Sequence, residues 1–505
     1  MATNSRYYIL FALLTCILFS IGAYFKFHKQ NEKLPVGCDE FGYLNMAKAF
    51  GEQNFFNDHA PRQFFLNLVD TLQQENIPEL EYKWMLTPHA YHFSAQTKEK
   101  VINQYPPATS FVLSLIPFEL RKTSFPFLTL FLTFLIPLLI AYFFLSIKNK
   151  KILLALSILM VLISLTVPFK SSLTMVNSLA LTFGLFIAAG LTAKEHKFIA
   201  LFCIVLAANF RIVNLLMLAP LSFYFLPEFM NYLTTKKWMP LLKMFLKAIS
   251  ISLMGISPYL FYVTLLLGNP LIPTYPSHDT AFVNANELIS NVFFYINIKD
   301  SWFRLLLICI SILLIQVKFK QLNLKEFWLL MTFPIFNYLF FIFHKMQINY
   351  YPFASSFILI GAIIFYFSKS KLIFFEKKAF IFIPLLLSSI MLIDGINRYF
   401  RKEHITFEES LKTYQSVCNY DVVWGEMYSG TAEYVCNNNG FKYVFGSEKA
   451  RAISFNYLKN HNYSQVIICD DVLLSTQEIV DELNNLSLPH KIIEDKTLGK
   501  LIIIN

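Results

Sequence analysis

Residues 124–147 read SFPFLTLFLTFLIPLLIAYFFLSI and contain no charged side chain. The hydrocarbon core of a bilayer is about 30 Å thick, and a helix of about 20 apolar residues crosses it. The stretch is therefore long enough to span a membrane. Similar apolar runs recur along most of the chain, so the sequence predicts a polytopic α-helical membrane protein.

The composition supports the same class. Of the 505 residues, 55% are hydrophobic and only 15% are charged, whereas soluble proteins carry about 25% charged residues. The formal net charge is +10, but the lysines and arginines lie mostly in short clusters between apolar runs, where they act as topology signals. No soluble basic face remains for a nucleic acid. We therefore expect membrane lipid as a partner, and no nucleic acid.

Eleven segments are candidates for membrane spans, and the first is expected to be an uncleaved signal-anchor helix. They cover residues 7–25, 124–147, 152–168, 172–193, 198–210, 212–227, 244–266, 303–317, 327–343, 352–368 and 379–397. The fifth and sixth are divided at Arg211, because one continuous helix would bury that charge near its middle. Residues 107–120 are also apolar, but a twelfth span would invert every later loop, so we expect them on or in the outer leaflet.

The positive-inside rule puts the N-terminus in the cytoplasm, together with most lysine clusters. Loops 26–106 and 268–302 and the tail from residue 399 then lie outside. The composition, rich in Phe, Ile, Lys and Asn, is typical of a bacterium with an AT-rich genome. We therefore expect a multi-pass protein of the bacterial plasma membrane, with its active site and tail extracytoplasmic.

The tail has a different pattern. Residues 421–424, 442–445 and 465–469 are typical of short buried strands, helical periodicity lies between them, and residues 490–505 resemble a hairpin. The sequence predicts a transmembrane domain over 1–398 and a small α/β domain with a largely parallel sheet over 399–505. Cys418 and Cys436 either pair in an oxidising compartment or remain buried thiols.

The most informative motif lies in the first outer loop. Residues 37–50 read GCDEFGYLNMAKAF. Apolar side chains recur there at helical spacing, which predicts that Asp39 and Glu40 lie at a helix start. One interpretation is that Asp39 is an N-cap and nothing more, because that position favours an N-cap aspartate. Held beside the membrane surface, its carboxylate can instead act as general base toward an acceptor hydroxyl.

This motif resembles the Asp-Glu element of the GT-C membrane glycosyltransferases, in particular the bacterial aminoarabinose transferases and the protein O-mannosyltransferases. Further segments resemble elements of that family in the same order. They are QYPP at 104–107, LAANFR at 206–211, PYLFY at 258–262, LGNP at 267–270 with Tyr275, and HK at 344–345 with NYYP at 349–352. Asn177 and Asn349 depart from the family pattern, which often has Asp and Arg there.

The resemblance covers about residues 1–400. It implies a GT-C-like fold and the inverting transfer of a sugar from a polyprenyl-phosphate donor to an acceptor hydroxyl at the outer face. Asp39 matches the catalytic base and Glu40 its partner. Because a base and cations suffice for such a transfer, we expect neither a cofactor nor a metal. The sugar and the acceptor, which is a glycan, a lipid or a protein, stay open.

A phosphate leaving group needs preorganised cations and hydrogen-bond donors. The candidates in or near the outer turns are Arg211, His344, Lys345, Lys299, Tyr105, Tyr350 and Tyr351. His278 and Asp279, in loop 268–302, are candidates for the acceptor cleft. The alternative is that the lysines only snorkel to headgroups and that the tyrosines belong to the interfacial aromatic belt.

Three other classes of protein compete with a glycosyltransferase. A transporter or flippase of lipid-linked saccharides predicts internal repeats, and none is evident. A polysaccharide polymerase or ligase typically has arginine-rich outer loops, and these loops are poor in arginine. A non-enzymatic assembly or receptor protein would bind its partner through the tail. The ordered motifs favour the glycosyltransferase.

Overall fold

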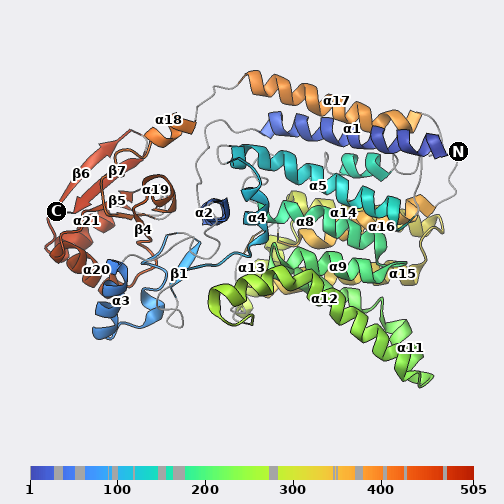
Figure 1. Ribbon diagram of the computed structural model, residues 1–505, viewed down its shortest axis with the longest axis horizontal. Helices are drawn as coiled ribbons and strands as arrows, with labels where there is room; N and C mark the ends of the chain where they lie inside the picture. The colour runs from blue at the N-terminus through green and yellow to red at the C-terminus, as the bar shows by residue number, and fades with distance from the viewer. Residues whose placement is uncertain are drawn as a thin grey trace. The chain divides into compact units, whose positions relative to one another are not determined.

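The structure is a computed structural model that describes residues 2–27, 38–51, 63–88, 90–93, 101–117, 120–145, 155–162, 177–271, 274, 283–344, 347–348, 351–369, 379–401, 407–425, 429–469, 475–496 and 498–504. It is mostly helical, and the chain divides into two compact units (Figure 1). The helical unit comprises Met1–His28, Ser124–Tyr262 and Tyr275–Arg401. The mixed unit comprises Lys29–Thr123, Val263–Thr274 and Lys402–Asn505.

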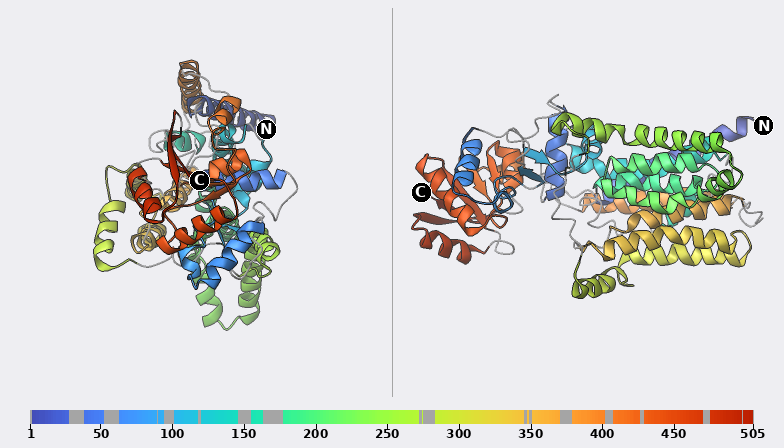
Figure 2. Two further views of the ribbon diagram at one scale, coloured as in Figure 1. Left: turned by 90° about the vertical axis from the view of Figure 1, so that its left-hand side faces the viewer. Right: turned by 90° about the horizontal axis from the view of Figure 1, so that it is seen from below.

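Apart from the predicted span 152–168, which lies partly outside the described residues, helices of the helical unit broadly coincide with the predicted spans, and most run roughly side by side (Figure 2). Their bounds are α1 (Ala2–Phe27), α5 (Arg121–Phe143), α8 (Asn177–Thr192), α9 (Lys197–Ala208), the 3-10 helix η4 (Ile212–Met217), α10 (Leu218–Ser222), α11 (Leu226–Thr234), α12 (Trp238–Leu267), α13 (Ala285–Tyr295), α14 (Ser301–Lys318), α15 (Leu324–Ile342), α16 (Phe353–Lys369) and α17 (Ala379–Phe400). The predicted division at Arg211 is confirmed, because α9 ends at Ala208 and η4 begins at Ile212. Helix α13 falls within loop 268–302, where no element was predicted.

Several of these helices have the length and composition of membrane spans. Among the residues that the structure describes, Tyr7–Lys26, Trp238–Leu267 and Ser301–Lys318 are long and apolar enough to cross a bilayer. Ile212–Ser222 and Leu226–Thr234 qualify together as a pair bent by 51°. The protein is therefore a membrane protein, and the total of eleven spans stays a prediction.

Glycines allow two pairs of helices to approach closely. A Cβ on Gly190 of α8 would lie 1.9 Å from the carbonyl oxygen of Ile358 in α16, and one on Gly361 would lie 2.1 Å from that of Ile187. A Cβ on Gly395 of α17 would lie 2.1 Å from the carbonyl oxygen of Gly22 in α1. The backbones can pack at these crossings only because no side chain intervenes.

The mixed unit combines the first outer loop with the tail. Its elements are α2 (Cys38–Gly51), α3 (Gln63–Gln74), η1 (Glu79–Glu81), β1 (Tyr91–Phe93), β2 (Val101–Asn103), α4 (Ala108–Ser114), α18 (Phe407–Lys412), β3 (Val422–Trp424), α19 (Ser429–Cys436), β4 (Asn439–Phe441), α20 (Glu448–Asn460), β5 (Gln465–Cys469), α21 (Thr476–Asn485), β6 (His490–Asp495) and β7 (Gly499–Ile504). With seven residues, α4 is too short to span a bilayer. Its relation to the outer leaflet stays a prediction.

The tail contains a five-stranded sheet of order β4-β3-β5-β7-β6. Strands β4, β3 and β5 are parallel, and β7 and β6 add antiparallel pairings. The predicted first and third strands and the hairpin are confirmed. The strand expected at 442–445 is wrong: β4 ends at Phe441, because Lys442 leaves the sheet and donates its N–H to the carbonyl of Met85 at 2.8 Å. Cys418 and Cys436 form a disulfide.

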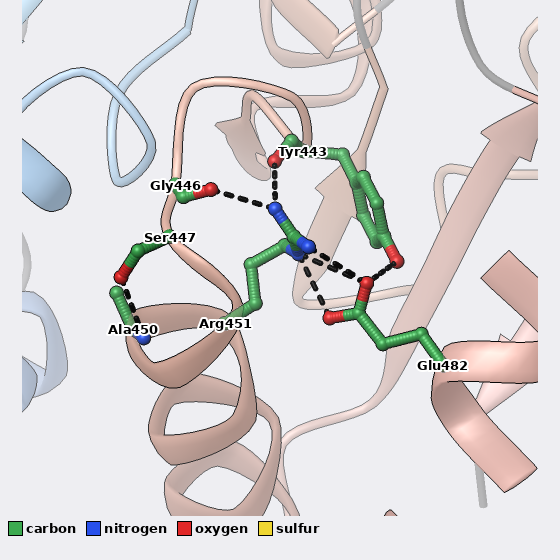
Figure 3. Close-up of polar contacts among 6 residues, drawn as sticks. All are labelled: Tyr443, Gly446, Ser447, Ala450, Arg451 and Glu482. Carbon is green, nitrogen blue, oxygen red and sulfur yellow. Dashed lines mark hydrogen bonds and ion pairs between the residues drawn. The ribbon is translucent and has the colours of Figure 1, made fainter. Parts of the chain in front are cut away.

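A half-buried ion pair joins α20 to α21 (Figure 3). The guanidinium of Arg451 donates to the Glu482 carboxylate at 2.8 Å, and the Tyr443 hydroxyl donates to the same carboxylate at 2.5 Å. Arg451 also donates to the carbonyl of Gly446 at 2.6 Å. These contacts hold the two helices and the turn after β4 together.

The predicted domain division between residues 398 and 399 stays a prediction. The structure groups the first outer loop and the tail in one compact unit.

Candidate functional site

The turn after α9 presents Arg211. The amide of Asn209 enters a break in α12 at Pro258, where it donates to the carbonyl of Gly255 at 2.6 Å and accepts from the N–H of Tyr259 at 2.9 Å. These are the carbonyl and N–H that an unbroken helix would pair with each other. Asn214 donates to the carbonyl of Ala207 at 2.8 Å. The two asparagines therefore fix the turn: their side chains bond the backbone of α9 and α12, and the N–H of Asn214 donates to the carbonyl of Arg211 at 3.0 Å.

Arg211 and Tyr351 form the centre of the candidate site. The Arg211 guanidinium donates to the Tyr351 hydroxyl at 3.1 Å, and its carbon lies 4.8 Å from the centre of the tyrosine ring. A cation–π contact and a hydrogen bond together restrict the orientation of the guanidinium. A cation oriented in advance suits an anionic oxygen of a phosphate better than a mobile one.

His344 belongs to the same cluster. Its ring and the Tyr351 ring both pack against Phe341, with ring centres 6.4 Å and 5.2 Å from the Phe341 centre. Tyr351 thus contacts Arg211 and shares its neighbour Phe341 with His344. The structure therefore joins Arg211 to Tyr351, and it puts Tyr351 and His344 in one aromatic group.

Helix α13 holds the segment that carries His344. Asn291 donates to the carbonyls of Ile342 and His344, each at 2.8 Å, and accepts from the amide of Gln347 at 2.7 Å. The Tyr295 hydroxyl accepts from the N–H of Ile348 at 3.1 Å. Sequence reasoning missed Asn291, Tyr295 and Gln347. The available signal was the spacing of four residues between Asn291 and Tyr295, which puts both side chains on one face of a helix.

Burial raises the pKa of Tyr295 to about 12, with a further raising effect from the nearby Tyr351 and an opposing one from its hydrogen bond with Ile348. The phenol is therefore protonated throughout the physiological range. It serves as a neutral support for the turn and carries no negative charge that would oppose phosphate binding.

Helix α2 carries the predicted catalytic pair in the mixed unit. It begins at Cys38, so Asp39 is its second residue, and Glu40 is buried. The predicted helix is confirmed. Asn103, at the end of β2, donates to the carbonyl of Gly42 at 3.0 Å and accepts from the N–H of Tyr105 at 2.9 Å. The side chain of Asp39 lies outside the part of the structure that is described.

Tyr105 supports α2. It is buried, its ring centre lies 4.5 Å from that of Tyr43, and its hydroxyl accepts from the Gln104 amide at 2.9 Å. A Cβ on Gly42 would lie 2.7 Å from the Tyr105 ring, so α2 packs directly against it. A contact of Tyr105 with substrate stays a prediction.

The remaining candidates are less informative. Lys299 is exposed in the turn before α14. Lys345, Tyr350, His278 and Asp279 lie outside the described residues. Within the part of the chain that is described, no group of three or more His, Cys, Asp or Glu side chains is arranged to hold a metal ion. Metal-independent chemistry stays a prediction.

No protein-family profile matches the sequence, and no curated protein matches it significantly. The fold, however, is similar to that of ArnT from Cupriavidus metallidurans in two solved structures. The structure of ArnT bound to undecaprenyl phosphate matches with a TM-score of 0.53 and 8% identity, over 99% of this chain and 98% of ArnT. ArnT in the apo state matches with a TM-score of 0.54 and 10% identity, over the same shares. The predicted resemblance to the aminoarabinose transferases is confirmed at the level of fold.

Proposed function

We propose that this chain is an integral membrane glycosyltransferase whose donor is a sugar linked to a polyprenyl phosphate. The observation that carries the proposal is the Arg211 guanidinium held against the ring and hydroxyl of Tyr351, whose neighbour Phe341 also packs against His344. This cluster belongs to a fold shared with a protein that was solved with undecaprenyl phosphate bound. A polyprenyl phosphate is therefore the ligand that best accounts for an oriented cation cluster in a membrane protein.

In the proposed reaction, an acceptor oxygen attacks the anomeric carbon of the donor from the side opposite the phosphate. The bond between that carbon and the phosphate oxygen breaks, and the configuration inverts. Asp39 takes the proton of the acceptor hydroxyl, and Glu40 orients the acceptor or the loop. Arg211 and His344 stabilise the charge that develops on the departing polyprenyl phosphate. In this proposal the chain spans the bacterial plasma membrane eleven times. The reaction occurs at the outer face of that membrane.

The test replaces the proposed base. Asp39→Asn, in membranes supplied with a radiolabelled polyprenyl-phosphate sugar, is expected to lower the rate of transfer by about 10²- to 10⁴-fold, because positioned bases contribute that much. Undecaprenyl phosphate binding should be retained. The exposed carboxylate of Asp70 in α3 provides the matched control, and Asp70→Asn should transfer sugar at the unaltered rate.

Full transfer by Asp39→Asn would reject Asp39 as the base. Movement of labelled lipid across liposomes by the unaltered protein, without a new glycosidic bond, would reject the transferase in favour of a transporter.

A further inference from the structure

Helix α19 of the tail packs directly on α2, the helix that carries Asp39 and Glu40. A Cβ on Gly430 would lie 2.6 Å from Cδ1 and 2.7 Å from Cγ of Phe41. Phe41 is buried, and it follows Glu40 directly. Atoms cannot approach that closely, so only glycine at position 430 permits the observed packing of α19 against the first turn of α2.

A second contact lies two turns further along α2. The ammonium of Lys48 lies 5.7 Å from the centre of the Tyr434 ring, one helical turn after Gly430 in α19. Contacts at Phe41 and at Lys48 restrain both the height and the tilt of α2 on α19.

Helix α19 is itself anchored at both ends. Its last residue, Cys436, is bonded to Cys418. Its Glu433 carboxylate accepts from the N–H of Gly440 in β4 at 2.9 Å. At its first residue, the carbonyl oxygen of Ser429 lies 2.5 Å from where a Gly440 Cβ would be. The sheet and the disulfide therefore hold α19 as a rigid support.

The tail reaches α2 by a second route through β1. Lys442 is only 2% exposed, and its ammonium donates to the carbonyl of Tyr91 at 3.1 Å. The Tyr91 hydroxyl accepts from the Asn45 amide in α2 at 3.0 Å. A buried ammonium is stable only when it is hydrogen-bonded, so this link is a fixed part of the unit.

We infer that the tail is a positioning element of the transfer reaction: the packing of Gly430 on Phe41 sets the orientation of α2, and thereby that of the Asp39 carboxylate. The inference rests on the proposed function, because it assigns Asp39 the role of base. It gives the tail a part in catalysis without assigning any tail residue a contact with substrate. A rigid support is what a general base requires, since an error of about 1 Å in position can cost on the order of 10²-fold in rate.

The test compares two glycines of the tail. Gly430→Ala is expected to lower kcat by about tenfold to a hundredfold while leaving KM for the donor unchanged, because Arg211, Tyr351 and His344 lie in the helical unit. Gly425→Ala is the matched control, since a Cβ there would meet its nearest atoms at an ordinary 3.6 Å. It should leave kcat and KM unaltered. A loss that arose only from misfolding would instead lower the amount of active enzyme, measured by undecaprenyl phosphate binding.

Rescue separates positioning from general damage. Phe41→Ala removes the Cγ and Cδ1 atoms that a Cβ at position 430 would meet, so the double variant Gly430→Ala with Phe41→Ala should recover most of the lost kcat. If Gly430→Ala does not fold, reduction of the unaltered, folded protein gives the same answer. Breaking the disulfide between Cys418 and Cys436 should lower kcat at constant KM, and the variant lacking both cysteines should be insensitive to the reductant.

Unaltered kcat in Gly430→Ala, or in the reduced protein where that is the test, would overturn the inference. A loss that Phe41→Ala does not rescue would also overturn it. Failure of the inference is distinguishable from failure of the proposed function, because in the first case Asp39→Asn remains inactive, whereas in the second it transfers sugar at the full rate.

Discussion

At the scale of single residues, Asn209 shows how one amide can support a binding group several residues away. Its side chain takes the place of a helical hydrogen bond at the break in α12, and Arg211 follows two residues later. Pro258 opens the helix because a proline inside a helix has no N–H and clashes with the preceding turn. The Asn209 amide therefore pairs with the two backbone groups of α12 that the kink at Pro258 separates.

Removing this amide should weaken donor binding. Asn209→Ala leaves the carbonyl of Gly255 and the N–H of Tyr259 without the partner they now have, at a cost of about 1–3 kcal/mol per buried group. We expect weaker undecaprenyl phosphate binding. Arg211→Gln removes the cation itself, so it gives the largest loss of binding against which the effect of Asn209→Ala is compared. Asn231→Ala, on an exposed face of α11, is the control. Unchanged binding by Asn209→Ala, measured by equilibrium titration, would show that the turn does not position Arg211.

Tyr443 gives a second residue-scale prediction, on stability against pH. Burial raises the pKa of the Tyr443 phenol well above its usual value, and the hydrogen bond and the charge of Glu482 raise it further. The folded unit therefore binds the phenol proton more tightly than the unfolded chain does. The stabilisation is complete below about pH 10, the usual value for tyrosine, and is lost as the pH rises above it.

The measurement is the free energy of unfolding of the unaltered protein and of Tyr443→Phe between neutral and alkaline pH. The variant should be less stable at neutral pH by about 1–3 kcal/mol, the range for a hydrogen bond to a charged group, and the difference should shrink above about pH 10. A difference that is constant with pH would contradict this account.

At the scale of elements, glycines determine how closely the helices pack. Apolar composition predicts that α8 and α16 are buried, but the short distance at Gly190 requires the absence of a Cβ on that one residue. Van der Waals packing of small residues is the main source of helix association in a membrane. The glycines of this pair therefore contribute more to the bundle than their lack of side chains suggests.

Gly190→Ala should destabilise the helical unit. The added methyl would lie 1.9 Å from the carbonyl oxygen of Ile358, and overpacking of this kind typically costs about 1–3 kcal/mol. We expect a lower midpoint of thermal unfolding in detergent. Ser311→Ala, on an exposed face of α14, should leave the midpoint almost unaltered. Equal midpoints for the two variants would show that a Cβ at position 190 does not lower the stability of the packing between α8 and α16.

At the scale of the whole molecule, the lysine distribution predicts a single topology. Residues 194–197 and 236–237 should be cytoplasmic, and loop 26–106, loop 268–302 and the tail should be outside. Single cysteines introduced at Lys194, Lys237 and Ser290, in a variant without native cysteines, allow labelling by a membrane-impermeant reagent. Only the cysteine at position 290 should react in intact cells. Labelling at 194 or 237 from outside would reverse the topology.

The sequence alone determined the elements whose signals are local. Uninterrupted apolar runs predicted the helices of the bundle, and the helical spacing after Asp39 predicted α2, because each depends only on neighbours along the chain. The charge of Arg211 likewise predicted the break between α9 and η4. The strand at 442–445 was wrong, because Lys442 leaves the sheet for the carbonyl of Met85. That long-range contact has no signature in the local pattern.

Only the tertiary structure decided which residues meet. It joined Arg211 to Tyr351, packed Tyr351 and His344 against Phe341, added Asn291 and Tyr295 as supports, paired Cys418 with Cys436, and packed the tail on α2. These contacts join residues far apart in the chain, and they arise from close packing and from the need of buried polar groups for partners. Both conditions act on the folded molecule as a whole, so no stretch of sequence carries them by itself.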